Sequence, residues 1–468
     1  MFFFSIYYLR FFTSLISVFC FFNILYSYYF NLYLNIDVYL YTLLIALLPN
    51  ISFFTKKKEV LRISIYYKIL TVILGYFILP FLISLPFYLS IYNISFLNAY
   101  FESISGFTST GFTVFDNIKH LDESLILWRS SSQWIGGLYF LFSILLLIDI
   151  FDDNLKKTLT NFLAFNSSEI FKQFLKIFIF YLFLTFIIFI IFNIFDFRSF
   201  TSLNLSFTVI SSGGFLPVNN LFSIASGPIK ISVLSLTMLI SFFSLFFIYN
   251  LFFIKEKGVK SIQEDLYLLI YLLIIFSIFF VFLNKNLDFK IFLLAISSSV
   301  SNIGLSLEQT PGNFSFIFIL LIIIGGSFFS TSSGLRFIKI YSLIKFSINE
   351  LISHSKPKNI FLNKLAFSDK NMNLDDFYKY FLTVLIFIIS LIVLSSILTI
   401  AELSVEDSFK LAALTLMNTV NSQMTGLDGF NFEELNYYIK YALILFMIIG
   451  RVELLTVLIL CKKFFFKN

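Results

Sequence analysis

Four short apolar segments in this chain each end in a few small polar residues and a glycine, and each lies between two long apolar stretches. The four endings are residues 108–111, 211–214, 301–304 and 423–426. The recurrence predicts one structural unit, made of a helix, a short segment with a loop and a second helix, used four times in one polypeptide. Four such loops around one axis can form a ring of carbonyl oxygens that replaces the water shell of a cation.

The composition indicates a membrane protein. Of the 468 residues, 59% are hydrophobic and only 13% are charged, whereas soluble proteins carry about 25% charged residues. So much apolar surface cannot be buried in one water-soluble core. The first residues lack a positively charged segment followed by a cleavage site, so we expect no cleavable signal peptide and a retained first helix at 11–30.

The lengths of the apolar stretches separate two kinds of helix. A membrane-spanning helix needs about 20 apolar residues. Ten stretches approach this length: 11–30, 38–54, 67–92, 125–150, 173–195, 229–254, 264–283, 314–345, 377–400 and 437–461. Four shorter segments lie between members of the last eight, at 96–107, 200–210, 289–299 and 405–421. These four are too short to cross, so we expect re-entrant half-helices.

The positions of lysine and arginine predict the orientation. If the amino terminus is cytoplasmic and every long stretch crosses, most of these residues fall on the cytoplasmic side, as the positive-inside rule requires. The four short segments then lie on the extracytoplasmic side. We expect an all-α integral membrane protein with four pseudo-symmetric helix–pore-helix–helix units around a central pore, after two N-terminal transmembrane helices. The expected divisions are 1–60, 61–160, 161–260, 261–350 and 351–468.

Other kinds of chemistry find little support in the sequence. The two cysteines, Cys20 and Cys461, lie in apolar runs near opposite ends, and the two histidines, His120 and His354, lie in expected loops. We therefore expect neither a disulfide framework nor a cysteine or histidine metal site. No phosphate-binding loop and no serine–histidine constellation is present, so we expect neither an enzyme nor a covalent cofactor. The net charge of +6 reflects loop lysines, and we expect contact with membrane lipid but not with nucleic acid.

The glycine-ended loops have the properties of an ion-binding backbone. Irregular backbone at membrane depth is tolerated only where it is buried in protein or lines water. The C-terminal end of a half-helix carries partial negative charge that favours a cation, and glycine allows successive carbonyls to turn toward an axis. The expected ion-binding residues are Thr108, Ser109, Thr110, Gly111, Ser211, Ser212, Gly213, Gly214, Ser301, Asn302, Ile303, Gly304, Gln423, Met424, Thr425 and Gly426.

A second segment is expected to interrupt a helix below these loops. Residues 325–334 contain three glycines, four serines and one threonine within an apolar stretch. The composition predicts a movable loop that blocks the pore; close helix packing through small residues is the alternative. Arg336 and Lys339, at the cytoplasmic end of this stretch, either anchor the helix or couple the gate to a regulatory partner.

Arg451 lies inside an apolar span, where insertion of an arginine costs about 2.5–3.5 kcal/mol. It is too far from the membrane surface to snorkel, so we expect it to face the pore below the loops as an electrostatic barrier. Glu453 and Glu102 are possible partners. The expected gate residues are Gly325, Gly326, Ser330, Thr331, Gly334 and Arg451.

Several motifs together resemble the Trk/Ktr family of potassium transporters. The segment 101–112, FESISGFTSTGF, is similar to the first pore loop of that family, and WRS at 128–130 with QWIGG at 133–137 resembles the start of the following helix. GGS at 325–327 with GLR at 334–336 is similar to the interrupted helix after the third loop. GRVELLT at 450–456 resembles the last helix of TrkH-type members, which also carry two leading helices.

The resemblance implies potassium uptake across a bacterial inner membrane, a homodimer and a cytosolic nucleotide-binding regulatory subunit similar to TrkA. It also implies one filter glycine in each loop, which we carry over to Gly111, Gly214 and Gly304; in the fourth loop either Thr425 or Gly426 takes this place. The alternatives are a secondary transporter of an organic solute, or a sodium-permeable cation channel. Broken helices occur in secondary transporters too, but these usually show two related halves.

Overall fold

The computed structural model describes residues 2–51, 65–151, 170–245, 247–249, 263–282, 288–307, 310, 314–353 and 374–452. The expectations for His354, Glu453 and Cys461 lie outside these residues. So do most of the linker predicted at 346–375, the last predicted motif beyond residue 452, and many of the loop lysines on which the orientation depends.

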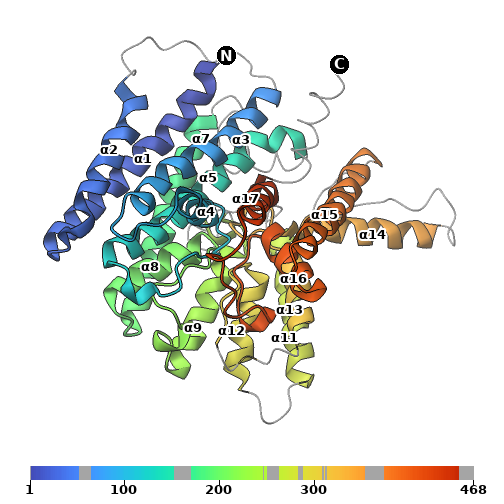
Figure 1. Ribbon diagram of the computed structural model, residues 1–468. Helices are drawn as coiled ribbons and strands as arrows, with labels where there is room; N and C mark the ends of the chain where they lie inside the picture. The colour runs from blue at the N-terminus through green and yellow to red at the C-terminus, as the bar shows by residue number, and fades with distance from the viewer. Residues whose placement is uncertain are drawn as a thin grey trace.

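Most of the described residues are helical, which confirms the predicted all-α membrane fold. The two leading helices, α1 (Phe2–Tyr29) and α2 (Ile36–Ile51), pack against each other and lie at the edge of the molecule (Figure 1). The short 3-10 helix η1 (Tyr33–Asn35) joins them. On α1, Phe12 and Ile16 are buried while Phe21 and Phe22 are more than half exposed. A helix that is apolar on its packed and its open face is typical of a lipid environment.

Four units follow. The first two contain α3 (Ile65–Tyr88), α4 (Phe96–Phe107), η3 (Ile118–His120) and α5 (Glu123–Phe151), then α7 (Ile170–Ile194), α8 (Ser199–Ile210), η4 (Leu221–Ser223), α9 (Pro228–Met238) and η5 (Leu239–Ser241). The last two contain α11 (Gln263–Phe282), α12 (Phe289–Val300), α13 (Ser315–Ile323), β1 (Ile324–Gly325), β2 (Leu335–Arg336) and α14 (Phe337–Ser353), then α15 (Leu374–Ile400), α16 (Val405–Leu416), η8 (Gln423–Thr425) and α17 (Tyr437–Val452).

Helix length follows the division read from the sequence. Of the ten predicted spans, six correspond to described helices that are long and apolar enough to cross a membrane, in α1, α3, α5, α7, α11 and α15. The described parts of the predicted spans 38–54 and 437–461, α2 and α17, have 16 residues each, and the predicted spans 229–254 and 314–345 are interrupted. The four predicted half-helices are α4, α8, α12 and α16, each of 12 residues. Among the long helices α5 is central, because all residues in the apolar window of its span are buried. In α11 and in α15 only 28% of the residues in this window are buried. The outer helices therefore turn their apolar side chains to lipid.

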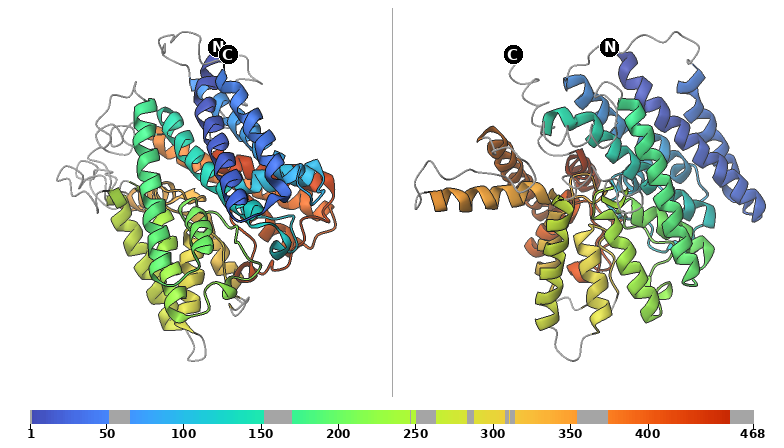
Figure 2. Two further views of the ribbon diagram at one scale, coloured as in Figure 1. Left: turned by 90° about the vertical axis from the view of Figure 1, so that its left-hand side faces the viewer. Right: turned by 180° about the vertical axis from the view of Figure 1, so that it is seen from behind.

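Two predicted continuous spans are broken. The stretch predicted at 314–345 is interrupted between α13 and α14, where the two-residue strands β1 and β2 pair in parallel and enclose residues 326–334. Beyond the break α14 extends sideways from the body of the molecule (Figures 1 and 2).

The prediction of a full span at 229–254 is wrong in its middle, because α9 ends at Met238 and the chain passes through η5 into non-helical backbone. That stretch is apolar enough to span, but its carbonyls bond to the loop 326–334 instead of continuing the helix. Phe242 O accepts from Ser327 N, and Ser241 O accepts from Ser332 N, each at 3.1 Å.

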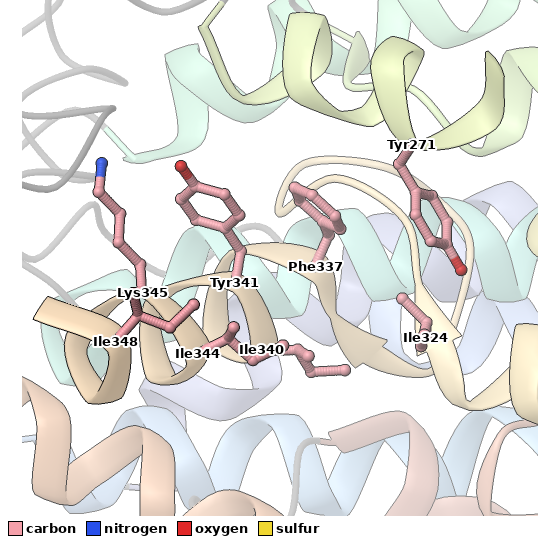
Figure 3. A pocket seen from close by; sticks show the side chains of 8 residues that line it. All are labelled: Tyr271, Ile324, Phe337, Ile340, Tyr341, Ile344, Lys345 and Ile348. Atoms are coloured by element: carbon pink, nitrogen blue, oxygen red, sulfur yellow. The ribbon is translucent and has the colours of Figure 1, made fainter. Parts of the chain in front are cut away.

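A groove of about 360 Å³ runs along α14 beside α11 (Figure 3). Its lining is apolar except at its ends, and it consists of Tyr271, Ile324, Phe337, Ile340, Tyr341, Ile344, Lys345 and Ile348. Ile324 and Phe337 flank the interruption, so one end of the groove reaches both sides of the loop 326–334.

Candidate functional site: a ring of four loops

The four half-helices end in the same way. Each is followed by a residue that continues the right-handed turn and then by one with a positive φ, a conformation that ends a helix abruptly. The residues with positive φ are Ser109 at 59°, Ser212 at 56°, Asn302 at 59° and Asn418 at 48°. Serine and asparagine are short polar residues, and asparagine in particular tolerates this region of backbone space.

One backbone hydrogen bond recurs in all four loops and fixes their common register. The second residue after the helix cap donates to the carbonyl three residues before the cap. The pairs are Thr110 to Ser105, Gly213 to Thr208, Ile303 to Ser298 and Thr419 to Leu414, at 2.8–3.0 Å. The next residue in each loop is therefore Gly111, Gly214, Gly304 and Val420, and these four occupy equivalent positions.

This register corrects the predicted fourth loop. Gln423, Met424 and Thr425 form η8, and Gly426 is its C-cap with a φ of 73°. A side chain on Gly426 would approach Lys410 Nζ at 2.9 Å, away from the other three loops. The prediction followed the glycine, but the end of α16 at Leu416 sets the register, so the equivalent segment is 417–420.

Hydrogen bonds join the second loop to the third, the third to the fourth and the fourth to the first. The Ser212 hydroxyl donates to Ser301 O and thereby joins loops two and three. Asn302 Nδ2 donates to Thr419 Oγ1 at 3.4 Å, and Asn418 Nδ2 donates to Thr110 Oγ1 at 3.0 Å, which joins loop four to its neighbours.

Loops one and two meet through their glycines. A Cβ on Gly111 would lie 2.8 Å from Gly214 Cα. Because Gly111 also has a φ of 86°, both its space and its backbone require glycine. Gly304, with a φ of 84°, is held in the same conformation.

The ring presents carbonyl oxygens without hydrogen-bond donors. The last two residues of every loop are buried, and in the described part of the chain no donor reaches their carbonyls. These residues are Thr110, Gly111, Gly213, Gly214, Ile303, Gly304, Thr419 and Val420. Buried carbonyls are normally paired, so a cluster of unpaired ones favours a bound cation. The hydroxyls of Thr108 and Ser211 are already used to cap their own helices, at 2.8 and 2.7 Å.

Side chains behind the loops hold the backbone in place. Ser105 Oγ donates to Phe112 O at 2.6 Å, and Thr208 Oγ1, at the equivalent position of the second unit, donates to Phe215 O at 2.8 Å. The first and second loops therefore share a side-chain support as well as a backbone register.

Arg451 lies beside this ring and contacts its first and second loops. It is 1% exposed, and its Nη2 reaches Ser109 Oγ at 3.3 Å and Ser211 O at 3.5 Å. Its Nη1 donates to the hydroxyl of Ser333 in the interrupting loop. The guanidinium therefore connects the ring with the loop 326–334.

Of the two acids predicted as partners of Arg451, Glu453 lies outside the described residues, and Glu102 does not pair with Arg451. Glu102 forms a buried ion pair with Arg129, at 2.8 Å between Oε1 and Nε. Among the described residues no carboxylate pairs with Arg451; instead its guanidinium stacks over the Phe140 ring, 4.0 Å from the centroid. Arg336 approaches the same ring at 5.0 Å.

Arg336 organises the interrupting loop. It is 2% exposed, and its Nη1 donates to Ser327 O, Ser330 Oγ and Ser332 O at 3.0, 3.2 and 2.9 Å. A residue expected to anchor the helix or contact a partner is thus turned inward. Phe140, between the two arginines, was not singled out from the sequence, because a phenylalanine in an apolar helix carries no distinguishing signal.

Other backbone atoms lie too close to two of the predicted gate glycines to leave room for a side chain. A Cβ on Gly325 would lie 2.2 Å from Ser333 O, and one on Gly326 would lie 2.4 Å from Phe242 O. Gly334 has a φ of 81°. Ser330 bonds to Ser327 O and Ser332 Oγ within the loop, while the buried Thr331 hydroxyl has no partner among the described atoms.

No family model matches the chain. An uncharacterised cation transporter of Methanocaldococcus jannaschii is 25% identical over 94% of this chain and 91% of its own length. The potassium uptake protein TrkH of Vibrio parahaemolyticus is 25% identical over 82% of this chain and 83% of its own length. The crystal structure of that potassium transporter superposes with a TM-score of 0.81, 21% identity and 98% coverage of both chains. The chain therefore has the fold of the potassium transporter TrkH and is similar in sequence to Trk system proteins over most of its length.

Proposed function

We propose that this protein takes up potassium across the inner membrane of a bacterium, through a filter of backbone carbonyls contributed by its four loops. The observation that carries the proposal is the ring of buried carbonyls without donors, bordered by the C-terminal ends of four half-helices. Carbonyl oxygens replace the hydration shell of potassium in selective filters, and helix C-termini favour positive charge. The names of the Vibrio and Escherichia relatives, potassium uptake proteins, support the choice of ion.

We assign the gate to the loop 326–334 together with Arg451. The support is their position in series with the ring: Arg451 bonds to the first and second loops on one side and to Ser333 on the other. A buried guanidinium in the path of a cation raises the electrostatic barrier to its passage. Potassium passes when the loop and the arginine withdraw together.

We also propose that the protein works as a homodimer with a cytosolic nucleotide-binding subunit similar to TrkA. Support comes from the Trk relatives and from α14, which is continuous with β2 and extends sideways from the body (Figure 2). A partner that displaces α14 moves the end of the gating loop directly.

The test is rubidium uptake, as a tracer for potassium, into vesicles that contain the purified protein. Gly111→Ser removes both the space and the backbone freedom that the ring needs, so uptake falls to the background of empty vesicles. Gly227→Ser is the matched control, because no atom lies within 4 Å of a Cβ at that glycine. Equal uptake by the two variants would refute the filter assignment. Organic solute uptake without dependence on potassium would favour the alternative of a secondary transporter.

A further inference from the structure

We propose that Val420 forms a hydrophobic constriction within the ring, and that its isopropyl group lies across the ion path. The inference rests on the proposed function. Its starting point is the register of the loops, in which Val420 stands where the other three have glycine.

The order of the units around the ring follows from helix packing. Helix α5 packs on α8, α9 on α12, α13 on α16, and α17 on α4. The units therefore follow one another in chain order, and the second and fourth loops lie opposite each other. Contact between these two loops crosses the ring.

The side chain of Val420 makes that contact. A Cβ added to Gly214 would lie 2.4 Å from Val420 Cβ, 2.8 Å from its Cγ1 and 3.1 Å from its Cγ2. Val420 also borders the other two glycines, since a Cβ on Gly111 would lie 3.0 Å from Val420 Cβ and one on Gly304 would lie 2.6 Å from Val420 O. One residue thus touches all three remaining positions.

Glycine is required at these three positions for two different reasons, one of backbone angle and one of space. Gly111 and Gly304 have φ values of 86° and 84°, which only glycine adopts at low cost. The φ of Gly214 is outside this region, so its backbone accepts other residues. What excludes a side chain at Gly214 is the volume that Val420 fills.

The consequence for ion passage is a narrow apolar segment among carbonyl oxygens. An isopropyl group offers no lone pair to a dehydrated cation, and apolar constrictions resist water and ions. Val420 therefore adds a barrier at the ring itself, in series with Arg451 beneath it. Shortening this side chain removes the barrier and keeps the fourth backbone carbonyl.

The first test is rubidium uptake into vesicles by variants of residue 420. Val420→Gly increases uptake about tenfold, which corresponds to about 1.4 kcal/mol of barrier. Val420→Ala, which adds no backbone freedom, gives an intermediate increase, and Val420→Leu decreases uptake. Val393→Ala, on an exposed face of α15, is the control and leaves uptake unchanged. Uptake equal to wild type in both Val420→Gly and Val420→Ala overturns the proposal.

The second test measures the contact without transport. Gly214→Ala lowers the midpoint of thermal unfolding in detergent, and Val420→Gly in the same chain restores it. Gly111→Ala is not restored by Val420→Gly, because its positive φ remains. Failure of Val420→Gly to rescue Gly214→Ala overturns the constriction. If wild type and Val420→Gly carry no rubidium while the rescue is observed, the proposed potassium uptake fails and the contact across the ring stands.

Discussion

Within the part of the chain that the structure describes, Arg451 is held by hydroxyls, one carbonyl and an aromatic face, and no carboxylate pairs with it. Its contacts are Ser109, Ser211, Ser333 and Phe140. A cation–π contact contributes about 2 kcal/mol when desolvated, which offsets part of the cost of burial. No described carboxylate neutralises this charge, which is consistent with the proposed barrier to cations.

Replacing Arg451 tests this role. Arg451→Ala removes the positive charge and three hydrogen bonds that tie the ring to the gating loop, so we expect faster rubidium uptake into vesicles. Arg198→Ala is the control, because Arg198 is largely exposed and pairs with Glu123 at the surface. Uptake that does not change in Arg451→Ala would contradict the barrier.

The ion pair of Glu102 and Arg129 supports the backbone that follows the first and second loops. Glu102 accepts from Val114 N and Thr113 Oγ1, while Arg129 donates to Leu216 O beyond the second loop. Because both partners are buried, Glu102→Gln leaves Arg129 with a poorly compensated charge, at a cost of about 3–5 kcal/mol. We expect a large fall in the midpoint of thermal unfolding.

The control for this prediction is Glu406→Gln, because the Glu406 side chain is 75% exposed and pairs with Lys410 one helical turn away. Surface pairs contribute about 0–1 kcal/mol, so its midpoint stays close to wild type. A small shift in both variants would show that the buried pair does not support the ring.

At the scale of elements, two helices approach the ends of half-helices through glycine. A Cβ on Gly136 in α5 would lie 1.9 Å from Phe107 O, and one on Gly450 in α17 would lie 2.3 Å from Leu416 O. Phe107 and Leu416 are the last residues of α4 and α16. The first and fourth units thus use the same close packing, in which small residues let backbones meet.

Gly136→Ala tests this packing. The added methyl group forces α5 away from the end of α4 and displaces the first loop, so we expect rubidium uptake to be lost while Gly227→Ala keeps it. Normal uptake by Gly136→Ala would mean that the loop does not depend on this contact.

The two broken helices form one assembly held by neighbouring acids at the start of α11. Glu264 Oε1 accepts from Phe328 N at 3.0 Å, and Asp265 accepts from Ser244 N and Ser244 Oγ at 2.9 and 2.6 Å. Leu245 N also donates to Phe329 O at 3.1 Å. Adjacent carboxylates thus fix both interruptions to the same helix end.

Asp265→Asn removes the negative charge that strengthens both bonds from Ser244, and replaces one of the two accepting oxygens by an amide nitrogen. We expect faster hydrogen exchange at 241–245 and at 326–332, because the second segment loses the surface on which it rests. Asp37→Asn, an exposed change in α2, leaves exchange at these residues unchanged. Faster exchange at 241–245 alone would show that the two breaks move independently.

For the whole molecule, helix number and type were largely readable from the sequence. The length of apolar runs separated spanning helices from half-helices, since both bilayer thickness and helix rise are fixed. The predicted half-helix at 96–107 matches α4, and the predicted interruption at 325–334 falls between β1 and β2. Arg451 was placed near the pore because its depth left no route to the surface.

The features that were not predicted depend on tertiary packing, which cannot be read from a single sequence. The break after Met238 in the second unit is stabilised by hydrogen bonds to a loop 80 residues away or more. Val420 was missed because glycine was used to mark the loops, and because the half-helix predicted at 405–421 extends past the end of α16 at Leu416. Phe140 and the inward turn of Arg336 follow from three-dimensional neighbours alone.

The central claim is that four main-chain loops converge on one dehydrated cation. The most direct measurement is anomalous X-ray scattering from crystals in which thallium replaces potassium. We predict a peak on the axis of the ring, coordinated by carbonyls from all four loops and lost in Gly111→Ser. Thallium peaks confined to other parts of the molecule, with none at the ring, would contradict the account.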